Sequence, residues 1–252
     1  MLSDRFMISD EQWALMEPHC LGKKSDPGRS GGDARIFMES VLWVARTGAP
    51  WCDLPAEFGH WNSVFKRFRH WVKRDIFYRM LKDLSADSDF EYIMIDGTIC
   101  KVHRHGQGAK RGTQSQAIGK SRGGMTTKIL ALTDALGNLI DFKLMPGQAH
   151  GLVKTRELLA GVYCQSLLAD KAFDADWLRD LLAERSIEAV IPPKSNRQNP
   201  ASCDMEVYKW RHLVENFFQK LKEFIRIAMR ACKTDTSFEA LIHIGATVIR
   251  TR

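Results

Sequence analysis

The spacing of apolar residues changes once along this chain of 252 residues, and that change limits the folds available to it. Up to about residue 84, apolar residues recur every three or four positions, which is typical of amphipathic helices. Beyond the short polar stretch 84–90 they form short runs that alternate with helical segments. We therefore expect a small all-helical domain over residues 1–88 and an α/β domain over residues 89–252.

Three helices are expected in the first domain. The first begins at Ser9, which precedes Gln12 at the spacing of a capping box. The second covers about 33–48 and the third about 62–81. The third is amphipathic and strongly basic, with Lys66, Arg67, Arg69, Lys73, Arg74, Arg79 and Lys82 against the single acid Asp75. This pattern fits either a helix-turn-helix-like module that enters a DNA groove or a plain helical bundle with a solvated basic face.

In the second domain, strands alternate with helices. The pattern predicts strands at 92–96, 166–170 and 189–191, a hairpin of 126–133 with 139–144, and helices at 151–162, 174–187, 207–227 and 237–249. An α/β order of this kind predicts a mixed sheet that is flanked by helices.

Two of the predicted strands end in an acid, Asp96 and Asp170. Since α/β sheets place ligands at the ends of their strands, both carboxylates are candidates for a catalytic site. An aspartate after an apolar run is also a common turn or capping residue, and this second interpretation applies to each of the two taken singly.

The predicted helix 207–227 carries a third carboxylate. At a rotation of roughly 100° per residue, one narrow stripe contains Tyr208, Arg211, Glu215 and Lys222. This stripe borders the apolar face, to which Trp210 is assigned. A carboxylate held there between two cations suits a half-buried site. Arg211 and Glu215 are also four residues apart, so an ordinary salt bridge on the helix surface is the alternative.

Three carboxylates on two strands and one helix could hold a pair of divalent ions. Hard oxygen ligands such as those of Asp96, Asp170 and Glu215 suit Mg²⁺ or Mn²⁺. Two such ions promote phosphodiester chemistry, because they activate the attacking oxygen and stabilise the leaving oxygen. The acids therefore predict metal-dependent chemistry on a phosphate ester.

A one-sided run of positive charge follows Asp96. The segment from Gly97 to Thr133 has no Asp or Glu but contains Lys101, Arg104, Lys110, Arg111, Lys120, Arg122 and Lys128. The whole chain has a formal net charge of +7, so an anionic partner is expected. We interpret residues 97–128 as a basic loop that holds DNA phosphates, and an ordinary solvated loop is the alternative.

The residues around the third acid resemble the DDE transposases of bacterial insertion sequences, most closely those of insertion-sequence family five. The family signature is Tyr, two residues, Arg, three residues, Glu, six residues and Lys. All four positions are matched, by Tyr208, Arg211, Glu215 and Lys222. The segments 95–98, 116–124 and 170–174 also resemble the family and occur in the same order. The resemblance extends over nearly the whole chain.

This resemblance implies an RNase H-like fold for the second domain and a catalytic, metal-binding triad of Asp96, Asp170 and Glu215. Asp174 competes with Asp170 for the second position of the triad. We prefer Asp170, because an acid four residues later more naturally starts a helix.

By the same resemblance, the chain is a DNA transposase that binds the inverted-repeat ends of its element, hydrolyses a phosphodiester at each end and joins the freed 3′-hydroxyls to target DNA. It would use two Mg²⁺ or Mn²⁺ ions per active site. Its partners would be double-stranded DNA and further copies of the chain in the DNA complex. The expected DNA contacts are Tyr208, Arg211 and Lys222 beside the triad, Lys101, Arg104, Lys110, Arg111, Lys120 and Arg122 in the basic loop, and Arg67, Lys73 and Arg74 in the helical domain.

Two other functions fit the same sequence. One is a catalytically inactive DNA-binding regulator derived from such a transposase, whose binding would depend on salt but not on a divalent ion. The other is a metal-dependent nuclease that cleaves DNA without joining it. The discriminating observations are therefore metal dependence and strand-transfer products.

The sequence also carries an expectation about location. No apolar run approaches the roughly 18 residues that a membrane span requires. The first residues lack the basic and apolar pattern of a signal sequence. We expect a protein of the bacterial cytoplasm that associates with the nucleoid.

Overall fold

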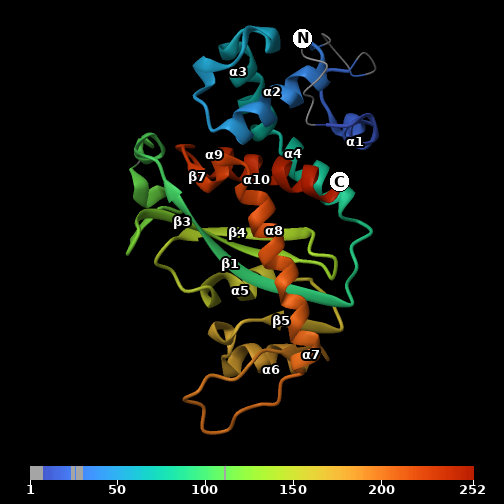
Figure 1. Ribbon diagram of the computed structural model, residues 1–252, viewed down its shortest axis with the longest axis vertical. Helices are drawn as coiled ribbons and strands as arrows, with labels where there is room; N and C mark the ends of the chain where they lie inside the picture. The colour runs from blue at the N-terminus through green and yellow to red at the C-terminus, as the bar shows by residue number, and fades with distance from the viewer. Residues whose placement is uncertain (1–7, 24–25, 27–30, 111) are drawn as a thin grey trace. The chain divides into compact units, whose positions relative to one another are not determined.

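The computed structural model describes residues 8–23, 26, 31–110 and 112–252 (Figure 1). The chain forms two compact units, each assembled from separate stretches of sequence. The first comprises Met1–Ala86, Val102–Gly112 and Leu221–Arg252, and the second comprises Asp87–Lys101 and Thr113–Lys220. The first junction between the units lies close to the expected domain boundary after residue 88, and the chain then returns twice to the first unit.

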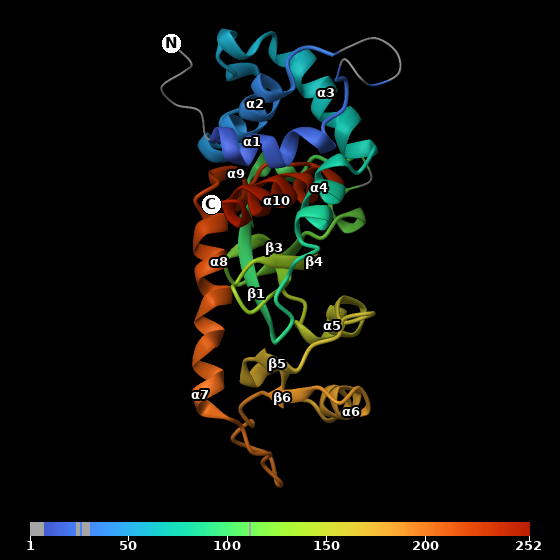
Figure 2. The ribbon, with the colours of Figure 1, turned by 90° about the vertical axis from the view of Figure 1, so that its right-hand side faces the viewer.

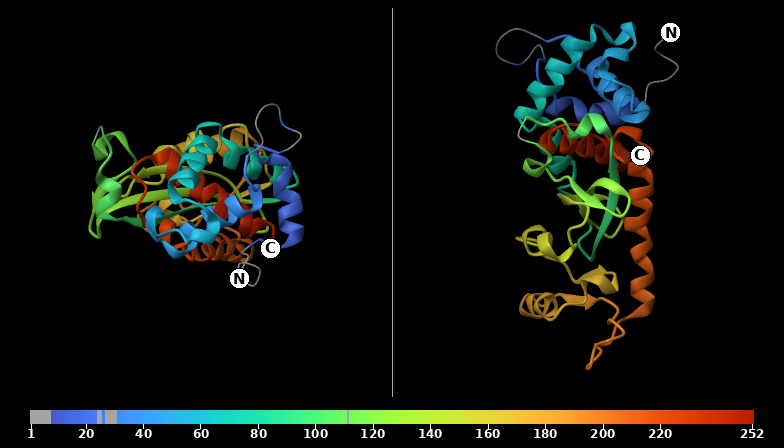
Figure 3. Two further views of the ribbon diagram at one scale, coloured as in Figure 1. Left: turned by 90° about the horizontal axis from the view of Figure 1, so that it is seen from above. Right: turned by 90° about the vertical axis from the view of Figure 1, so that its left-hand side faces the viewer.

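The N-terminal part of the first unit is helical, as the sequence predicts. The helices of the whole first unit are α1 (Asp10–Met16), α2 (Ala34–Thr47), α3 (Trp61–Lys73), α4 (Ile76–Leu84), α9 (Ile225–Ala228) and α10 (Asp235–Arg250). They are joined by the 3-10 turns η2 (Glu17–His19), η3 (Trp51–Asp53), η4 (Ala56–Phe58) and η5 (Arg104–Gln107) and the short strand β7 (Met229–Arg230). Helix α10 packs against α2, α3 and α4, and its red ribbon lies against the blue and teal helices in Figure 3. Since Phe238 and Leu241 of α10 are fully buried, the C-terminal helix completes the core of this unit.

Local sequence signals account for the ends of α1 and α2. The Ser9 hydroxyl accepts the N–H of Gln12 and the Gln12 side chain accepts the N–H of Ser9, which is the predicted capping box. Asp33 caps α2 by accepting the N–H groups of the next turn. Gly48 ends α2 in the left-handed conformation, at φ 73°, where glycine is unstrained.

The single helix predicted over about 62–81 is wrong, because α3 and α4 are separate helices. The chain breaks at Asp75, which has a left-handed φ of 53°. The ring of Phe77 in α4 lies 5.7 Å from that of Phe68 and 5.8 Å from that of Trp71, both in α3. The break therefore lets two short helices bury their aromatic faces against each other. Apolar spacing continues across the break, so the sequence pattern does not show it.

The second unit is a mixed sheet flanked by helices, which confirms the predicted architecture. Its strands are β1 (Tyr92–Val102), β2 (Gly119–Ser121), β3 (Gly124–Thr133), β4 (Leu139–Pro146), β5 (Ser166–Ala169) and β6 (Glu188–Val190). The strand order is β2-β3-β1-β5-β6, with β4 also paired to β3. The pairs β1–β3, β2–β3 and β3–β4 are antiparallel, whereas β1–β5 and β5–β6 are parallel.

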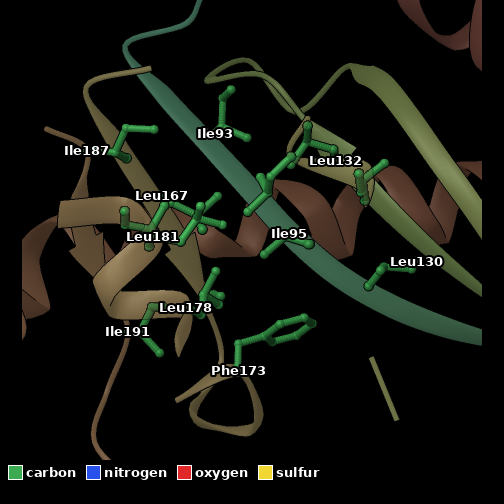
Figure 4. Packing of buried hydrophobic residues seen from close by; sticks show 14 of the residues in the cluster. Ile93, Ile95, Leu130, Leu132, Leu167, Phe173, Leu178, Leu181, Ile187 and Ile191 are labelled. Carbon is green, nitrogen blue, oxygen red and sulfur yellow. The ribbon is translucent and has the colours of Figure 1, made fainter. Parts of the chain in front are cut away.

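Helices cover both faces of this sheet. They are α5 (Leu152–Leu158), α6 (Asp176–Glu184), α7 (Met205–Tyr208) and α8 (His212–Lys222), with the 3-10 turns η6 (Thr113–Ser115), η7 (Lys171–Phe173) and η8 (Lys209–Arg211). Helix α8 lies on one face beside β1, and α5 and α6 lie on the other (Figure 2). The core is on the α5–α6 side, where Ile95 and Leu167 of the strands meet Leu178 and Leu181 of α6 (Figure 4). Because side chains alternate along a strand, Asp96 projects from the opposite face.

Two further predictions about this unit need correction. Strand β1 continues to Val102 instead of ending at Asp96, so Asp96 lies inside a strand. Much of the predicted basic loop 97–128 is likewise strand, because β3 pairs with β1 from Asp96 to Lys101. Residues 97–102, 119–121 and 124–128 are in strands, whose backbone hydrogen bonds do not depend on apolar side chains, whereas the described residues of 103–118 form 3-10 turns and irregular loop.

The predicted helix 207–227 is also interrupted. It consists of α7, the 3-10 turn η8 and α8, and it ends at Lys222, after which α9 begins at Ile225. The predicted hairpin of 126–133 with 139–144 is correct, since β3 and β4 form it with only slightly longer strands. Within the described ranges, no helix has the length and apolar character needed to cross a bilayer.

The break at Asp75 can be tested by substitution. The Asp75 side chain is exposed and makes no capping hydrogen bond. A β-branched residue is strained in the left-handed region, so Asp75→Val should lower the free energy of unfolding by about 1–2 kcal/mol. Asp75→Gly should stay within about 0.5 kcal/mol of the wild type. Urea unfolding measures both, and equal stability of the two variants would contradict the left-handed break.

Candidate active site

Pairing of two parallel strands brings two of the predicted acids together. Ile95 of β1 lies opposite Ala169 of β5. The next residue on each strand is an acid, Asp96 and Asp170. Asp170 directly follows β5 and caps the turn η7, where its carboxylate accepts the N–H of Ala172 at 2.9 Å. The two carboxylates are therefore neighbours at the point where β1 and β5 stop pairing.

Asp96 is a largely buried carboxylate, with 20% of its side chain exposed. Its Oδ1 accepts the N–H of Gly97 at 2.7 Å and its Oδ2 accepts Nη1 of Arg211 at 2.8 Å. Burial raises the pKa of Asp96 above its ordinary value, and the charge of Asp170 adds to the rise. The hydrogen bond from Gly97 and the charge of Arg211 lower the pKa but do not offset burial.

Arg211 joins the strand to the helix. Its guanidinium donates to Asp96 from Nη1 and to Glu215 from Nη2, and 18% of its side chain is exposed. Burial by itself would lower the pKa of Arg211. The nearby negative charges, above all that of Asp96, outweigh burial and raise the pKa above its ordinary value. The guanidinium carbon also lies 5.8 Å from the ring centroid of Tyr208, within the range of a cation–π contact. Arg211 thus holds Asp96 and Glu215 to one guanidinium.

The remaining signature residue, Lys222, is the last residue of α8, seven positions after Glu215. Glu215 is the more open of the acids bound by Arg211, with 49% of its side chain exposed. The predicted salt bridge between Arg211 and Glu215 is present. It coexists with the ion pair between Arg211 and Asp96. Both interpretations, a salt bridge on the helix surface and a half-buried site, therefore apply in part.

The donor set suits a hard divalent ion. Asp96 is buried beside a second carboxylate, and a cation bound there would offset the burial and the repulsion that together raise its pKa. Carboxylate oxygens are the ligands that Mg²⁺ and Mn²⁺ prefer. Over the part of the chain that the structure describes, no three His, Cys, Asp or Glu side chains lie close enough together to bind a metal as they stand. The guanidinium of Arg211 supplies the positive charge between Asp96 and Glu215 instead.

Asp174, the competing acid, has its carboxylate oxygens engaged in structural contacts. Its side chain is fully buried and accepts Nε of Arg179 at 2.8 Å, Nε of Arg197 at 2.7 Å and the N–H of Lys194 at 2.8 Å. Burial alone would raise the pKa of Asp174, but these hydrogen bonds outweigh it and lower the pKa to about 2. The carboxylate therefore ties α6 to the segment after β6.

The basic residues predicted to contact DNA are mostly exposed. Lys101 of β1 and Gly119 of β2 both pair with Thr126 of β3, from its two sides. The exposed members are Lys101, Arg104, Lys110, Lys120, Arg122, Lys73 and Arg74. Arg111 lies outside the described residues. Exposure and charge are the properties that a phosphate contact requires.

Arg67 differs from the other predicted DNA contacts. Its guanidinium donates to the backbone oxygens of Leu21, Gly32 and Asp33, at 2.9 to 3.2 Å. It also lies 4.5 Å from the ring centroid of Phe37. These contacts favour a packing role for Arg67 over contact with DNA. Its place on a basic helix did not reveal this, because the carbonyl acceptors come from a distant loop.

One aromatic residue beside the site was assigned to the wrong face. Trp210 was expected on the buried side of its helix, but it is 54% exposed. It lies in the 3-10 turn η8, whose tighter winding shifts side chains away from the positions of a regular helix. The exposed indole is next to Arg211 in the chain and stacks near His212, with 6.3 Å between the ring centroids. Exposed aromatic rings of this kind are suited to stacking on nucleic-acid bases.

A mixed sheet in this order, with acids on two neighbouring parallel strands and a third on the helix across one face, defines an RNase H-like protein with a carboxylate site. The particular family follows from comparison with known proteins. Residues 87–249 match the family described as "Transposase DDE domain", and residues 8–81 match "Putative transposase of IS4/5 family". The chain belongs to the DDE transposases of bacterial insertion sequences.

The chain is also similar to individual known proteins. The chain is 37% identical over 127 residues to the "Putative transposase for insertion sequence element IS6501" of Brucella ovis, covering 50% of this chain and 98% of that protein. It is 33% identical over 104 residues to protein y4sN of Sinorhizobium fredii, covering 41% and 83% of the two chains. Among solved structures, a piggyBac transposase in a synaptic complex with hairpin DNA matches with a TM-score of 0.58 and 13% identity, over 97% of this chain and 70% of that one. This last likeness concerns the fold.

The buried ion pairs of Asp174 give a prediction about stability. Asp174→Ala should lower the free energy of unfolding by about 3 kcal/mol, because it leaves two partly buried guanidinium groups without their carboxylate. Asp176→Ala is the matched control, since Asp176 also pairs with Arg197 but is 82% exposed. It should cost less than about 1 kcal/mol. Guanidinium chloride unfolding distinguishes the two, and similar losses would contradict the structural role of Asp174.

The same carboxylate predicts sensitivity to acid. The pKa of Asp174 is about 2 in the folded chain, below its ordinary value of 3.8. A depressed pKa stabilises the fold fully above the ordinary value, and this stabilisation is lost as the pH falls through the folded value. The stability difference between wild type and Asp174→Asn should therefore shrink between about pH 4 and pH 2. Unfolding curves across this range measure it, and a constant difference would contradict the shifted pKa.

Proposed function

We propose that this transposase binds the inverted-repeat ends of its insertion sequence, hydrolyses a phosphodiester at each end and joins the 3′-hydroxyl ends to target DNA. One observation carries the proposal: Arg211 links Glu215 of α8 to Asp96 of β1, and β1 pairs with β5, which Asp170 directly follows. These are the acids that the family resemblance assigns to catalysis. Their grouping from three separate parts of the chain supports that assignment.

Asp96, Asp170 and Glu215 are proposed to hold two Mg²⁺ or Mn²⁺ ions. Bound ions would polarise the scissile phosphate and make water a better nucleophile at neutral pH. The chain's own contribution is to hold the carboxylates in place. The N–H of Gly97 donates to Oδ1 of Asp96, and the N–H of Ala172 donates to Oδ1 of Asp170. These hydrogen bonds orient one oxygen of each carboxylate, and the other oxygen of Asp96 accepts from Arg211.

Arg211 is proposed to position two of these carboxylates and to contact DNA. Its pairing with Asp96 offsets the cost of burying that carboxylate, and its pairing with Glu215 orients the helix residue toward the strand. Tyr208 supports the guanidinium from one side. We propose that Tyr208, Arg211 and Lys222 contact the transposon end next to the reacting phosphate.

DNA binding itself is proposed to depend on exposed cations. They are Lys101, Arg104, Lys110, Lys120 and Arg122 in the segment 97–128, and Lys73 and Arg74 in the helical region. Arg111, which lies outside the described residues, is proposed to join them on its charge alone. Each phosphate that they neutralise releases counterions, so binding should weaken steeply as salt rises. Holding two transposon ends at once requires more than one copy of the chain, so we propose a homo-oligomer in the DNA complex. A DNA partner of this kind agrees with a place in the bacterial cytoplasm, at the nucleoid.

A catalytically inactive DNA-binding regulator is the second candidate function. The observation in its favour is that the Arg211 guanidinium pairs with two of the three proposed metal ligands. A regulator would bind the same DNA with the same salt dependence, but no divalent ion would change the outcome. A nuclease without joining activity differs from the transposase only in lacking strand-transfer products.

Replacing the helix acid tests the proposal. Glu215→Gln keeps the side-chain volume but removes the charge that would bind metal. It should lower Mg²⁺-dependent cleavage and strand transfer about a thousandfold or more, while the affinity for DNA changes less than about threefold. The substrate is a duplex that carries the DNA flanking the gene for this chain, and products are separated on denaturing gels.

Glu184→Gln is the control, because Glu184 is an exposed residue at the end of α6 that loses the same charge. It should leave cleavage unchanged. Equal activity in Glu215→Gln would refute the catalytic assignment. DNA binding by the wild type without any Mg²⁺-dependent product would favour the regulator.

A further inference from the structure

A recessed pocket of about 230 Å³ lies within the first unit, outside the part of the chain that carries the three acids. Turn η3, helix α3 and the start of α10 line it, together with the segment between α9 and α10. Three of its lining residues are cationic, Arg69, Arg226 and Lys233, and no acid of the described chain lines it. One concave surface therefore concentrates positive charge.

Arg226 is the unusual member of this set. Only 8% of the residue is exposed, and its Nη1 donates to the backbone oxygens of Gly48 and Ala49 at 3.1 and 2.5 Å. Its Nε is buried and has no hydrogen-bond partner. No carboxylate of the described residues forms an ion pair with it. A buried donor without a partner is unfavourable, so this N–H points to an acceptor that the chain itself does not supply.

The start of α10 borders the same pocket through Thr234 and Ser237. This helix has 16 residues, and the N–H groups of its first turn carry partial positive charge. Thr234 caps the helix by accepting the N–H of Ser237. Nη1 of Arg69 donates to the Ser237 hydroxyl at 3.0 Å, which holds the Arg69 guanidinium at this helix end. Asp235, the first residue of the helix, pairs with Arg230, which does not line the pocket.

The far wall is apolar and rigid. The ring of Trp51 lies 5.4 Å from that of Phe65 and 5.1 Å from that of Phe68, and all three residues line the pocket. An apolar wall lowers the local dielectric constant, so that charges on a ligand interact more strongly with the three cations than they would in open solvent.

We propose that this pocket binds a phosphate group. A phosphate presents several acceptor oxygens, which match the guanidinium groups of Arg69 and Arg226 and the ammonium of Lys233. The phosphate is carried either by a DNA strand or by a free phosphate ion, and both present the same oxygens. The proposal does not depend on catalysis, because all of its residues belong to the first unit.

A titration with inorganic phosphate tests the pocket. It is performed by calorimetry on the full chain, in EDTA and at constant ionic strength set with chloride. The double variant Arg69→Gln/Lys233→Gln should bind phosphate at least about tenfold more weakly than the wild type, because hydrogen bonds to charged groups are lost. The control Lys66→Gln/Arg79→Gln removes two exposed cations of the same unit that do not line the pocket, and it should change the affinity less than about twofold.

Arg226→Lys probes the buried donor directly. It retains a cation that can reach the carbonyls of Gly48 and Ala49 but removes Nε. It should also weaken phosphate binding about tenfold, with a Tm in chloride alone that is no lower than that of the wild type. If this variant does not fold, the double variant still decides the question, since both of its residues lie nearer the surface. Equal phosphate affinity in the double variant and its control would overturn the proposal that this pocket binds phosphate, whatever the cleavage assay shows.

A DNA titration without metal identifies the source of the phosphate. If DNA supplies it, the double variant should bind a short duplex more weakly than the control does, and inorganic phosphate should compete with DNA for the wild type but not for the double variant. If the double variant and its control bind DNA equally while their affinities for inorganic phosphate differ, the pocket binds free phosphate.

Discussion

Parallel pairing between β1 and β5 is the constraint on which the candidate site depends. Asp96 and Asp170 are 74 positions apart in the sequence, and only the register that sets Ile95 against Ala169 makes them neighbours. A shift of one residue along β1 would turn Asp96 into the apolar core, because successive side chains point to opposite faces. Burial of Ile93 and Ile95 on the core face therefore keeps Asp96 on the α8 face.

Charge balance then organises that face. Asp96 is buried beside a second acid, which is unfavourable without a cation. The guanidinium of Arg211 supplies one and, by reaching Glu215 as well, connects the helix acid to the strand acids. The need for a neighbouring cation also explains why Asp170 and Asp174, four residues apart, have different environments. Asp174 is surrounded by cations from Arg179 and Arg197 and has become a structural anchor, whereas Asp170 caps a turn next to Asp96.

Sequence patterns were accurate where the determining interactions are local. The capping box at Ser9, the helix end at Gly48 and the hairpin of β3 with β4 each depend on residues a few positions apart. The patterns failed where distant packing decides the backbone. The break at Asp75 follows from aromatic contacts between two helices, and the exposure of Trp210 follows from a 3-10 turn inside an apparently regular helix.

The family, the mixed α/β architecture and the residue types that could form an acidic site were predictable from the sequence, because a fixed spacing of Tyr208, Arg211, Glu215 and Lys222 is a local property of one segment. Which groups meet depends on the folded chain. It set Asp96 within a strand beside Asp170 and engaged Asp174 with two arginines. It also gathered the three pocket cations from α3 and the C-terminal segment. Contacts between residues so far apart depend on strand register and helix packing, which no local spacing encodes.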